Sequence, residues 1–531
     1  MSDRVRVLVA ESLSPVALEE LAGVEGFEAE ERFGLSREAL RQAIPPYDAL
    51  VIRSGTRVDA PLLEAGESLR VVARAGIGVD NVDVEAATER GVLVMNAPEG
   101  NVVTTAEHTL ALLLALARKV PQAMASLRSG AWERGRFVGA ELFEKTLGVV
   151  GLGRVGSAVV PRAQGLGMKV IVHDPYISAE AAARRGVRLV DLSTLLRESD
   201  YITLHVPLTP ETRHLIGRDA LAQVKRGARL INCSRGGVAD EEALIEALEA
   251  GRLAGAGLDV FEEEPPRNRR LLEREDVVVT PHLGASTREA QENVALAVVR
   301  QLVAYFRDGA IINGVNMPAL GPELLEKVGP YLKLAEKLGS FLAQLSPGGI
   351  RGVRVRYAGP LEEPGIKPLT AAALKGVLSH FLHGARVNLV NAAHLAKERE
   401  IEVAETTSGP DPVFADLLEV ELRTDAEARR VAGTFVRPGM PRIVRLDDYH
   451  LEADPTGYML VFTNRDAPGV IGRIGTILGN NQINIAGMQL GRVARYEMAV
   501  ALVNVDDPIP PAVLAEIRAL GNIMDARLVQ L

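Results

Sequence analysis

The sequence has little cysteine, few aromatic residues and no excess of positive charge. Its 531 residues include one cysteine, Cys233, which excludes an intramolecular disulfide and a multi-cysteine metal site. Aromatic residues make up 4% of the chain, and Trp132 is the single tryptophan. Because the net charge is -9, no basic excess is available to neutralise a nucleic-acid backbone, and we expect no nucleic-acid partner.

Long hydrophobic runs are also missing. The longest, residues 110–117, is far shorter than the roughly 20 apolar residues that a membrane-spanning helix requires. The first residues, MSDRVRVLVAESLSP, hold an apolar run too short for the core of a signal peptide. We therefore expect a cytoplasmic protein without a membrane partner, in which residues 110–117 form a buried helix.

The first part of the chain has an alternating pattern of strands and helices. From residue 4 to about residue 308, short β-branched runs such as VRVLVA, LGVVGLG and VVVTPH alternate with helical segments. Several of these runs lack polar alternation, which is typical of parallel strands covered on both faces. The pattern predicts one helix over residues 241–253 and a long amphipathic helix over residues 287–308.

The pattern changes near residues 316–318 and again near residues 454–457. Between these breaks we expect a helix over 323–344, a strand at GGIRGVRVRYAG and further helix over 370–400. After the second break the order is strand, helix, two strands, helix, strand, beginning at YMLVFT and ending at IMDARLVQL. This order is typical of a ferredoxin-like unit.

A glycine-rich loop, GLGRVG, lies between an apolar strand and a helical segment. Gly151 permits a tight turn, Gly153 lets backbone N–H groups approach a pyrophosphate, and Gly156 lets helix pack on strand. Asp174 ends the next strand about 20 residues later, where an acid can bind ribose hydroxyls and repel a 2'-phosphate. The pattern therefore favours NAD over NADP. The alternatives are a connector without a ligand and, for Asp174, a helix cap.

Three polar residues each follow a predicted strand. They are Arg235 after ARLINCS, Glu264 after GAGLDV and His282 after VVVTP. In a parallel sheet these strand ends face one crevice, so the three can converge. His282 has a suitable pKa for taking a hydroxyl proton, Glu264 can orient its ring, and Arg235 can hold a carboxylate. Singly, each could instead be a turn cap, a solvated acid or a structural cation.

A second group of residues could bind a phosphate. Arg53 and Arg74 end the predicted strands ALVIR and LRVVAR, and Ser54, Gly55 and Gly76 follow them. We expect backbone N–H groups to be accessible there, and both strand ends to face the same cleft. The alternative is that these arginines are ordinary surface cations.

These motifs together resemble the D-isomer-specific 2-hydroxyacid dehydrogenase family. GLGRVG, Asp174, INCSRGG, LDVFEEEPP and PHLGAST occur in the order of that family, over residues 4–316. The resemblance implies that Arg235 binds substrate and takes part in catalysis, and that Glu264 is the partner of the acid/base His282. It implies NAD contacts at Gly151, Gly153, Arg154, Val155, Gly156, Asp174, Cys233, Ser234, Arg235, Asp259, His282, Leu283, Gly284 and Ala285. Ile77 and Val206 lack the hydroxyl groups of some relatives.

The segments RSGTRVD, ARAGIGVDNVD and WER, taken together with the C-terminal extension, resemble the long-form members of this family. The resemblance implies oxidation of D-3-phosphoglycerate to 3-phosphohydroxypyruvate, the first step of the phosphorylated pathway to L-serine. It also implies a homodimer or homotetramer. The implied substrate contacts are Arg53, Ser54, Arg74 and Gly76, with Arg134 reaching in from a neighbouring subunit.

The resemblance also implies a division into four domains. A Rossmann-like doubly wound NAD domain, 98–285, is inserted in a flavodoxin-like substrate domain made of 1–97 and 286–316. An α+β intervening domain, 317–453, and a ferredoxin-like ACT domain, 454–531, follow. L-serine is the implied effector of the ACT domain, bound by Asp466 and by Asn484 of an adjacent subunit. The alternatives are an N-cap and a turn residue.

Other functions fit part of these observations. His380, His383 and His394 have helical spacing, but no carboxylate or cysteine completes a set, and we expect no metal. A glycerate, hydroxypyruvate or glyoxylate reductase would explain the catalytic residues but not the extra arginines or the C-terminal extension. A NAD-sensing, corepressor-like interaction protein would bind the cofactor without turnover.

Overall fold

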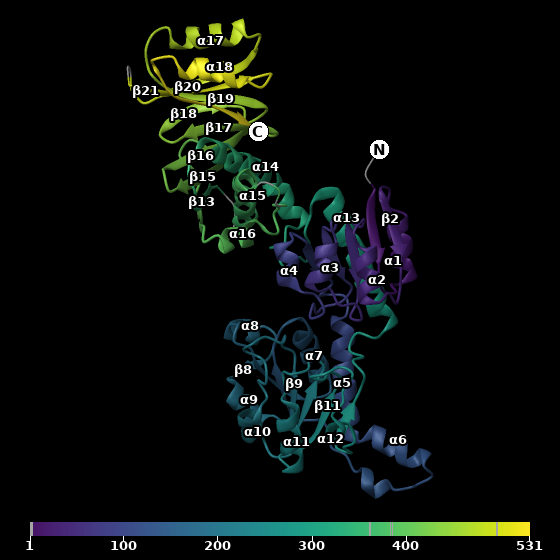
Figure 1. The fold of residues 1–531 in the computed structure, drawn as a ribbon. Coiled ribbons are helices and arrows are strands. Elements are labelled where there is room, and N and C mark those ends of the chain that lie inside the picture. The colour runs from purple at the N-terminus through teal and green to yellow at the C-terminus, as the bar shows by residue number, and fades with distance from the viewer. Residues whose placement is uncertain (1–3, 360–362, 383, 385, 495–496) are drawn as a thin grey trace.

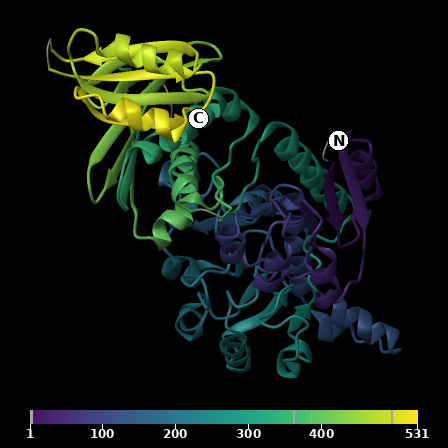
Figure 2. The ribbon, with the colours of Figure 1, turned by 45° about the horizontal axis from the view of Figure 1, so that its top comes forward.

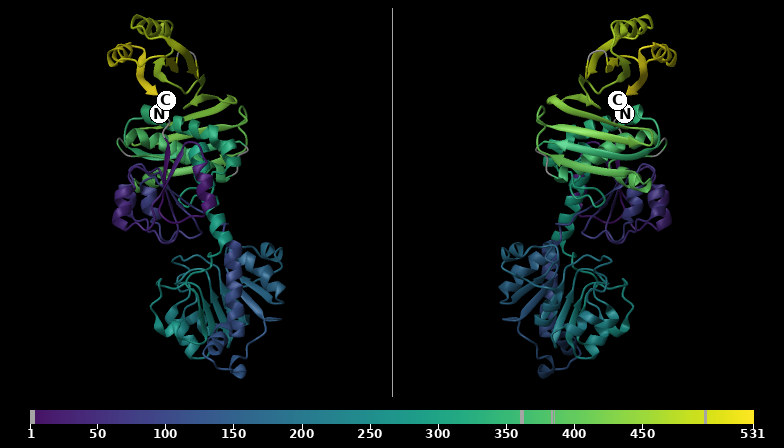
Figure 3. Two further views of the ribbon diagram at one scale, coloured as in Figure 1. Left: turned by 90° about the vertical axis from the view of Figure 1, so that its right-hand side faces the viewer. Right: turned by 90° about the vertical axis from the view of Figure 1, so that its left-hand side faces the viewer.

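The computed structural model describes residues 4–359, 363–382, 384, 386–494 and 497–531, which form four β-sheets. Figures 1 and 3 show these sheets with their helices following one another along the molecule. The second sheet of the chain lies at one end and the fourth lies at the other, so the first and third sheets separate them.

The first sheet is parallel, with the order β2-β1-β3-β4-β5. Its strands are β1 (Val5–Val9), β2 (Phe27–Glu31), β3 (Ala49–Ile52), β4 (Val71–Arg74) and β5 (Leu93–Asn96). Its helices are α1 (Pro15–Ala22), α2 (Arg37–Ala43), α3 (Ala60–Ala65) and α4 (Val84–Glu89). This strand order is flavodoxin-like, as expected. The sequence pattern missed β2, which is largely acidic, and β5, which is short.

Helix α13 (Arg288–Asp308) returns the chain to the first sheet. It packs on α1 and against β4 and β5, and the Nε atom of Arg300 lies 2.8 Å from a carboxylate oxygen of Glu20. Thr287 caps its first turn, and Gly309 ends it in the left-handed conformation with φ 76°. The whole second sheet is therefore inserted between β5 and α13.

The second sheet contains seven parallel strands in the order β12-β11-β10-β9-β6-β7-β8. The strands are β6 (Thr146–Val150), β7 (Lys169–His173), β8 (Arg188–Leu189), β9 (Tyr201–Leu204), β10 (Ala228–Asn232), β11 (Leu253–Leu258) and β12 (Val277–Val279). The order reverses between β6 and β9, which is the switch point where dinucleotides bind in Rossmann-type sheets. The prediction of a doubly wound domain is confirmed.

Helices cover both faces of this sheet. They are α5 (Val102–Arg118), α7 (Arg154–Gly165), α8 (Ala179–Ala183), α9 (Leu192–Glu198), α10 (Arg218–Gln223), α11 (Glu241–Glu249) and α12 (Arg269–Leu272). Helix α6 (Val120–Arg128) follows α5 and buries none of its residues. The predicted buried helix over residues 110–117 is confirmed within α5. In the described part of the chain no single helix is long and apolar enough to cross a membrane; α5 and α6, bent by 62°, pass that test only as a pair.

One predicted helix, over residues 241–253, is too long. Helix α11 ends at Glu249, and Leu253 already begins β11. Gly251 has φ 61°, a left-handed conformation that ends the helix, so Leu253 belongs to the next strand.

The third sheet is mixed, with the order β14-β13-β15-β16-β17-β18. Its strands are β13 (Ile350–Ala358), β14 (Glu402–Ser408), β15 (Leu417–Thr424), β16 (Ala428–Arg437), β17 (Met440–Leu446) and β18 (Tyr449–Ala453). Helices α14 (Pro322–Leu345) and α15 (Glu363–Phe381) pack together and against it, beside α16 (Ala392–Glu398). The predicted continuous helix over 370–400 is wrong, because the chain forms two helices there. The sequence pattern did not predict β14 to β18.

The fourth sheet confirms the ferredoxin-like prediction. Its order is β20-β21-β19-β22; Figure 1 shows α17 and α18 above it, and Figure 2 shows the same sheet and helices after a turn of 45°. The elements are β19 (Tyr458–Arg465), α17 (Val470–Asn480), β20 (Ile485–Arg492), β21 (Met498–Val505), α18 (Pro511–Arg518) and β22 (Ile523–Gln530). Strand β18 of the third sheet contacts β20, so the two sheets adjoin.

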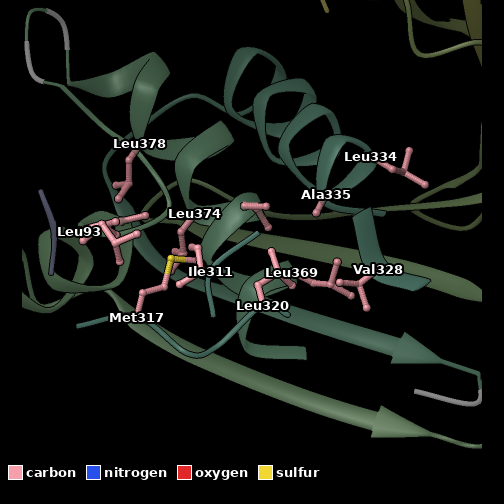
Figure 4. Packing of buried hydrophobic residues seen from close by; sticks show 14 of the residues in the cluster. Leu93, Ile311, Met317, Leu320, Val328, Leu334, Ala335, Leu369, Leu374 and Leu378 are labelled. Atoms are coloured by element: carbon pink, nitrogen blue, oxygen red, sulfur yellow. The ribbon is translucent and has the colours of Figure 1, made fainter. Parts of the chain in front are cut away.

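A single hydrophobic core joins the first and third sheets. Leu93 of β5 belongs to the same buried cluster as Met317, Leu320, Leu374 and Leu378. Figure 4 shows Leu93 and Met317 beside the helices of the third sheet. The α14/α15 layer is thus attached to the first sheet by buried apolar contacts.

Candidate active site

A cleft of about 820 Å³ is lined by loops from the first and second sheets. Most of the predicted cofactor, substrate and catalytic residues line it: Arg53, Ser54, Arg74, Gly76, Arg154, Val155, Cys233, Ser234, Arg235, Asp259, Glu264, His282, Gly284 and Ala285. The predicted residues outside the lining are Gly151, Gly153, Gly156, Asp174, Leu283 and Arg134.

The glycine-rich loop has the geometry that its three glycines predict. Gly151 has φ 92°, and a Cβ atom there would lie 2.5 Å from the carbonyl oxygen of His205. At Gly156 a Cβ would lie 2.1 Å from the carbonyl oxygen of Gly151, so helix α7 could not approach β6. A Cβ at Gly153 would meet nothing within 4 Å. Gly153 thus leaves open space at the N-terminus of α7, which suits an anionic phosphate.

Asp174 lies directly after β7 and bonds to the glycine-rich loop. Its Oδ2 atom accepts a 2.8 Å hydrogen bond from the Leu152 N–H, and its Oδ1 atom accepts one of 2.9 Å from the Tyr176 N–H. The cap of the following helix, α8, is Ser178. The helix-cap alternative for Asp174 is therefore wrong, and its carboxylate stands beside the loop that would hold a dinucleotide.

His282 and Glu264 form a hydrogen-bonded pair in the cleft. The His282 Nδ1 atom lies 2.8 Å from the Glu264 Oε2 atom, and the Phe261 N–H donates to Oε1 at 3.2 Å. The hydrogen bond from Glu264 raises the pKa of His282 above its ordinary value; burial opposes this and the charge of Glu264 adds to it. Burial acts to raise the pKa of Glu264, but the hydrogen bond and charge of His282 outweigh it and lower that pKa. The pair therefore favours an imidazolium beside a carboxylate.

Asp259 is fully buried below the loop that carries His282. Its oxygens accept hydrogen bonds of 2.7 Å from the N–H groups of both Leu283 and Gly284. Thr280 donates to the same carboxylate at 2.6 Å, and His108 lies 3.1 Å from it. Asp259 thus supports the turn in which His282 has φ 56°. Asp259 also lines the cleft, and a cofactor contact at this residue stays a prediction.

Arg235 follows β10 and crosses the cleft. Its Nε–H donates to Oδ2 of Asp80 at 3.0 Å, and its Nη1 donates to the carbonyl oxygen of Ser234 at 2.7 Å. Asp80 belongs to the loop after β4 of the first sheet. The guanidinium is therefore held between the two sheets.

Arg74 is a largely buried cation at the end of β4. Its Nε atom is buried without a hydrogen-bond partner in the described part of the chain. Burial, followed by repulsion from Arg235, lowers the pKa of Arg74 to about 10. A buried, incompletely bonded guanidinium favours an anionic ligand.

The loop with Arg53 differs from the prediction in one respect. We expected the N–H of Gly55 to be accessible, but it donates to Glu11 Oε2 at 3.1 Å. Glu11 Oε1 accepts 2.8 Å hydrogen bonds from the N–H groups of Arg53 and Thr56. The N–H of Gly55 therefore cannot hold a phosphate in this arrangement, and the Arg53 guanidinium remains the candidate group of this loop.

Arg134 does not reach the cleft of its own chain. It begins a 3-10 helix, Arg134–Phe137, whose Arg136 lies 2.6 Å from Glu275. Glu275 precedes β12, so this segment lies at the amino ends of the strands, while the cleft is at their carboxyl ends. Figure 1 shows the adjoining α6 away from α3 and α4 of the first sheet.

The two predicted regulatory residues lie at opposite ends of the fourth sheet. Asp466 follows β19, where Arg492 donates to its carboxylate at 3.2 Å. Asn484 precedes β20, which runs parallel to β19 because both are antiparallel to β21, and it donates to Asp506 at 2.7 Å. One chain therefore cannot bring both to one ligand. The N-cap of α17 is Gly469, so the cap alternative for Asp466 is wrong.

Some other residues that line the cleft offer no charged group for catalysis or binding. Ile77 and Val206 line it without hydroxyl groups. Burial raises the pKa of the Cys233 thiol to about 12, so the thiol stays protonated. Within the described ranges no group of three or more His, Cys, Asp or Glu residues could hold a metal ion. His383 lies outside the described residues.

Four polar residues at this site were not predicted from the sequence: Glu11, Asp80, Asn81 and His108. The first three follow strands of the first sheet, and the rule applied to Arg235, Glu264 and His282 would have found them. His108 lies on α5, remote in sequence from Asp259, and only packing joins them.

Comparisons with known proteins divide the chain into matched segments. Residues 110–284 match the D-isomer specific 2-hydroxyacid dehydrogenase, NAD binding domain. Residues 327–447 match the D-3-phosphoglycerate dehydrogenase intervening domain, and residues 458–522 match the ACT domain.

Similar proteins extend over the whole chain. D-3-phosphoglycerate dehydrogenase of Synechocystis sp. is 44% identical, with 99% of this chain and 95% of that protein covered. The protein of the same name from Bacillus subtilis is 39% identical, with 99% of each covered. Among solved structures, D-lactate dehydrogenase of Escherichia coli has a TM-score of 0.53 at 32% identity, covering 59% of this chain and 100% of that one. That of Aquifex aeolicus, complexed with NAD and lactic acid, has a TM-score of 0.53 at 26% identity, covering 60% and 99%.

Proposed function

The chain belongs to the D-3-phosphoglycerate dehydrogenase family, and from this membership we propose that it oxidises D-3-phosphoglycerate to 3-phosphohydroxypyruvate, the first step towards L-serine. It is an NAD-dependent D-2-hydroxyacid dehydrogenase. The observation that carries the substrate assignment is a single cleft in which the His282–Glu264 pair and Arg235 face the cations Arg53 and Arg74. An acid with a hydroxyl group, a carboxylate and a phosphate suits this arrangement.

The residues of the second sheet fit a dinucleotide. Open space at Gly153 and the N-terminus of α7 suit its pyrophosphate. We propose that Asp174 binds the adenosine ribose, and that Arg154, Val155, Cys233, Ser234, Gly284 and Ala285 line the cofactor's course through the cleft. NAD, when bound, accepts the electron pair removed from the substrate carbon.

We assign proton transfer to His282. To take the proton of the substrate hydroxyl, the ring must be neutral at Nε2, while Nδ1 keeps its hydrogen bond to Glu264. As Nε2 gains the proton, the ring becomes cationic, and the Glu264 carboxylate stabilises that charge. Asp259 holds the backbone directly after His282, which keeps the ring in place.

Arg235 and the two arginines of the first sheet would bind the substrate at its ends. We propose that Arg235 binds the carboxylate and that Arg53 and Arg74, with Ser54 and Gly76 beside them, bind the phosphate. The Nε atom of Arg74 has no hydrogen-bond partner among the described residues, which supports this role because an anion would supply one.

The test is NADH production from a panel of D-2-hydroxy acids with and without a 3-phosphate. We expect D-3-phosphoglycerate to have the highest kcat/KM. A higher value for glycerate or lactate would favour another D-2-hydroxyacid dehydrogenase, and NADH binding without turnover of any acid would favour a NAD-sensing interaction protein.

We propose the following domain limits for this activity. The substrate domain comprises residues 1–97 and 286–316, the NAD domain 98–285, the intervening domain 317–453 and the ACT domain 454–531. The sheet assignments support them, since β1 to β5 with α13, β6 to β12, β13 to β18 and β19 to β22 each fall within one unit.

We further propose that the ACT domain binds L-serine between two copies of the chain. Gly469 has φ 85° and opens the N-terminus of α17 to a carboxylate, and Asp466 would hold the ammonium group. Because Asp466 and Asn484 lie at opposite ends of the sheet, Asn484 would come from a second copy. Calorimetric titration of serine into wild type and Asp466→Ala tests this, and equal binding by the two would contradict it.

We also propose that the protein is a homodimer or homotetramer, since the proposed serine site needs a second copy of the chain. Trp132, Val138 and Phe143 are 78%, 71% and 66% exposed, which suits a contact with another copy, and Arg134 lies in the same segment. Sedimentation analysis would show the assembly. We place the enzyme in the cytoplasm, a reducing compartment compatible with its single buried thiol.

A further inference from the structure

The Arg235 guanidinium is held by a residue of the opposite domain. Asp80 lies between β4 and α4 of the first sheet, and its Oδ2 atom is 3.0 Å from Nε of Arg235. The other anchored nitrogen, Nη1, donates to the backbone of Ser234. Nη2 has no hydrogen-bond partner within the described ranges, so the outer edge of the guanidinium keeps N–H donors for a ligand.

Gly78, in the same loop, leaves the space that the Arg235 side chain occupies. A Cβ atom at Gly78 would lie 2.0 Å from Nη2 of Arg235 and 2.6 Å from Oδ2 of Asp80. The guanidinium therefore lies directly against the loop backbone. Its position is set by contact with the loop as well as by charge.

The residue after Asp80 joins this loop to the proposed phosphate site. Nδ2 of Asn81 donates to the carbonyl oxygens of Arg53 at 2.7 Å and Thr56 at 2.6 Å. Asp80 and Asn81 thus connect Arg235, which we propose to bind the carboxylate, to the loop of Arg53, which we propose to bind the phosphate.

We propose that Asp80 is a positioning residue, whose carboxylate holds Nε of Arg235 across the domain boundary and leaves the outer edge of the guanidinium to bind the substrate carboxylate. This inference rests on the proposed function. Asp80 is 64% exposed and Arg235 27%, so the ion pair adds little stability. Its effect is orientation, since a guanidinium held by one edge loses less freedom when the other edge binds a carboxylate.

The experiment compares wild type with full-length Asp80→Asn in steady-state kinetics. We expect KM for D-3-phosphoglycerate and the inhibition constant of oxalate to rise about tenfold, because one charge-assisted hydrogen bond is lost. Inhibition by inorganic phosphate and the dissociation constant of NADH should stay unchanged. We expect kcat to fall less than KM rises.

The matched control is Asp83→Asn. It makes the same charge change three residues later, but Asp83 caps α4 through the Ala86 N–H and has no contact with Arg235. It should change the melting temperature little, because Asn caps a helix about as well as Asp, and it should leave the oxalate constant unchanged. Asp80→Glu, which keeps the charge, should recover part of the oxalate binding.

Two outcomes would overturn the role of Asp80. One is an unchanged oxalate constant and KM in a folded, active Asp80→Asn enzyme. The other is an equal loss of oxalate, phosphate and NADH binding, which would indicate a purely structural effect. Failure of the proposed function is distinguishable, because wild type itself would then not oxidise D-3-phosphoglycerate.

Discussion

At the scale of single residues, some charged groups of the site have their partner within the described chain and others do not. His282 and Glu264 are partners in the same chain, and each is only partly exposed. Arg74 instead has a buried nitrogen that finds no hydrogen-bond partner in the part of the chain that the structure describes. The first pair is complete before substrate arrives, whereas Arg74 gains its partner only with an anion, and two different substitutions test these roles.

Glu264→Gln should shift the pH dependence of oxidation to lower pH. Oxidation needs neutral His282, so kcat/KM rises as pH increases through the pKa of His282, which Glu264 raises above its ordinary value. Removing the carboxylate lowers that pKa, and turnover should fall by about 10²-fold because the cationic ring loses its partner. Rate profiles from pH 5 to 10, together with NADH affinity as a binding control, would show this. An unchanged acid limb would remove Glu264 from this role.

Arg74→Met should damage catalysis while preserving stability. It removes a buried guanidinium that lacks a full set of partners, so the melting temperature should stay the same or rise. kcat/KM for D-3-phosphoglycerate should fall about 10²-fold, and much less for an unphosphorylated acid. The control is Arg70→Met, whose guanidinium lies 4.8 Å from the Phe306 ring centroid, outside the cleft lining. Equal losses on both acids would argue against phosphate recognition.

At the scale of elements, different glycines of the turn from β6 to α7 are needed for the packing of the helix and for the binding of a ligand. Gly156 is needed for the helix to approach the strand, while a Cβ atom at Gly153 would meet none of the described residues within 4 Å. Glycine is therefore needed at position 156 for packing and at position 153 to leave space for a ligand.

Gly153→Ala should accordingly impair cofactor binding, and Gly156→Ala should impair stability. Gly153→Ala should keep the melting temperature within a few degrees but weaken NADH binding at least tenfold, because its methyl group would occupy the approach to the pyrophosphate. Gly156→Ala should lower the melting temperature clearly, since its Cβ would lie 2.1 Å from a backbone oxygen. Calorimetry and NADH fluorescence measure the two effects. Normal NADH binding by Gly153→Ala would place the cofactor elsewhere.

At the scale of the whole molecule, the third sheet is fastened to the first by more than its connecting chain. Nδ2 of Asn388 donates to the carbonyl oxygen of Gly91 at 2.8 Å, and Nη1 of Arg386 donates to that of Leu69 at 3.1 Å. Buried apolar residues of the two sheets also belong to one core. A ligand at the fourth sheet can therefore influence the first through packed elements, provided that these have two arrangements.

Leu374→Ala should destabilise both sheets together. Leu374 is fully buried in the shared core, so the substitution should cost about 2–5 kcal/mol. In calorimetry the transition that contains the first and third sheets should shift as one, while the second sheet keeps its own. A matched control is Leu244→Ala on α11, which is buried in the separate core of the second sheet. Independent melting of the first and third sheets would contradict the shared core.

The sequence by itself determined features that depend on local order. The GLGRVG loop, Asp174 after its strand and the strands before Arg235, Glu264 and His282 could be predicted because turns, strand ends and apolar runs are written in neighbouring residues. The βαββαβ order was readable for the same reason. Helix ends such as that of α11 and short strands such as β5 were not, since a few residues carry too weak a pattern.

Only the tertiary structure decided which distant residues meet. Asp80 reaches Arg235 across 155 positions, His108 reaches Asp259 across 151, and Glu11 occupies the N–H of Gly55 across 44. No local pattern encodes such contacts, because they arise when separate sheets and helices pack and bring their loops to one cleft. The same packing joined the first and third sheets in one core, which the break in pattern near residues 316–318 had suggested were separate.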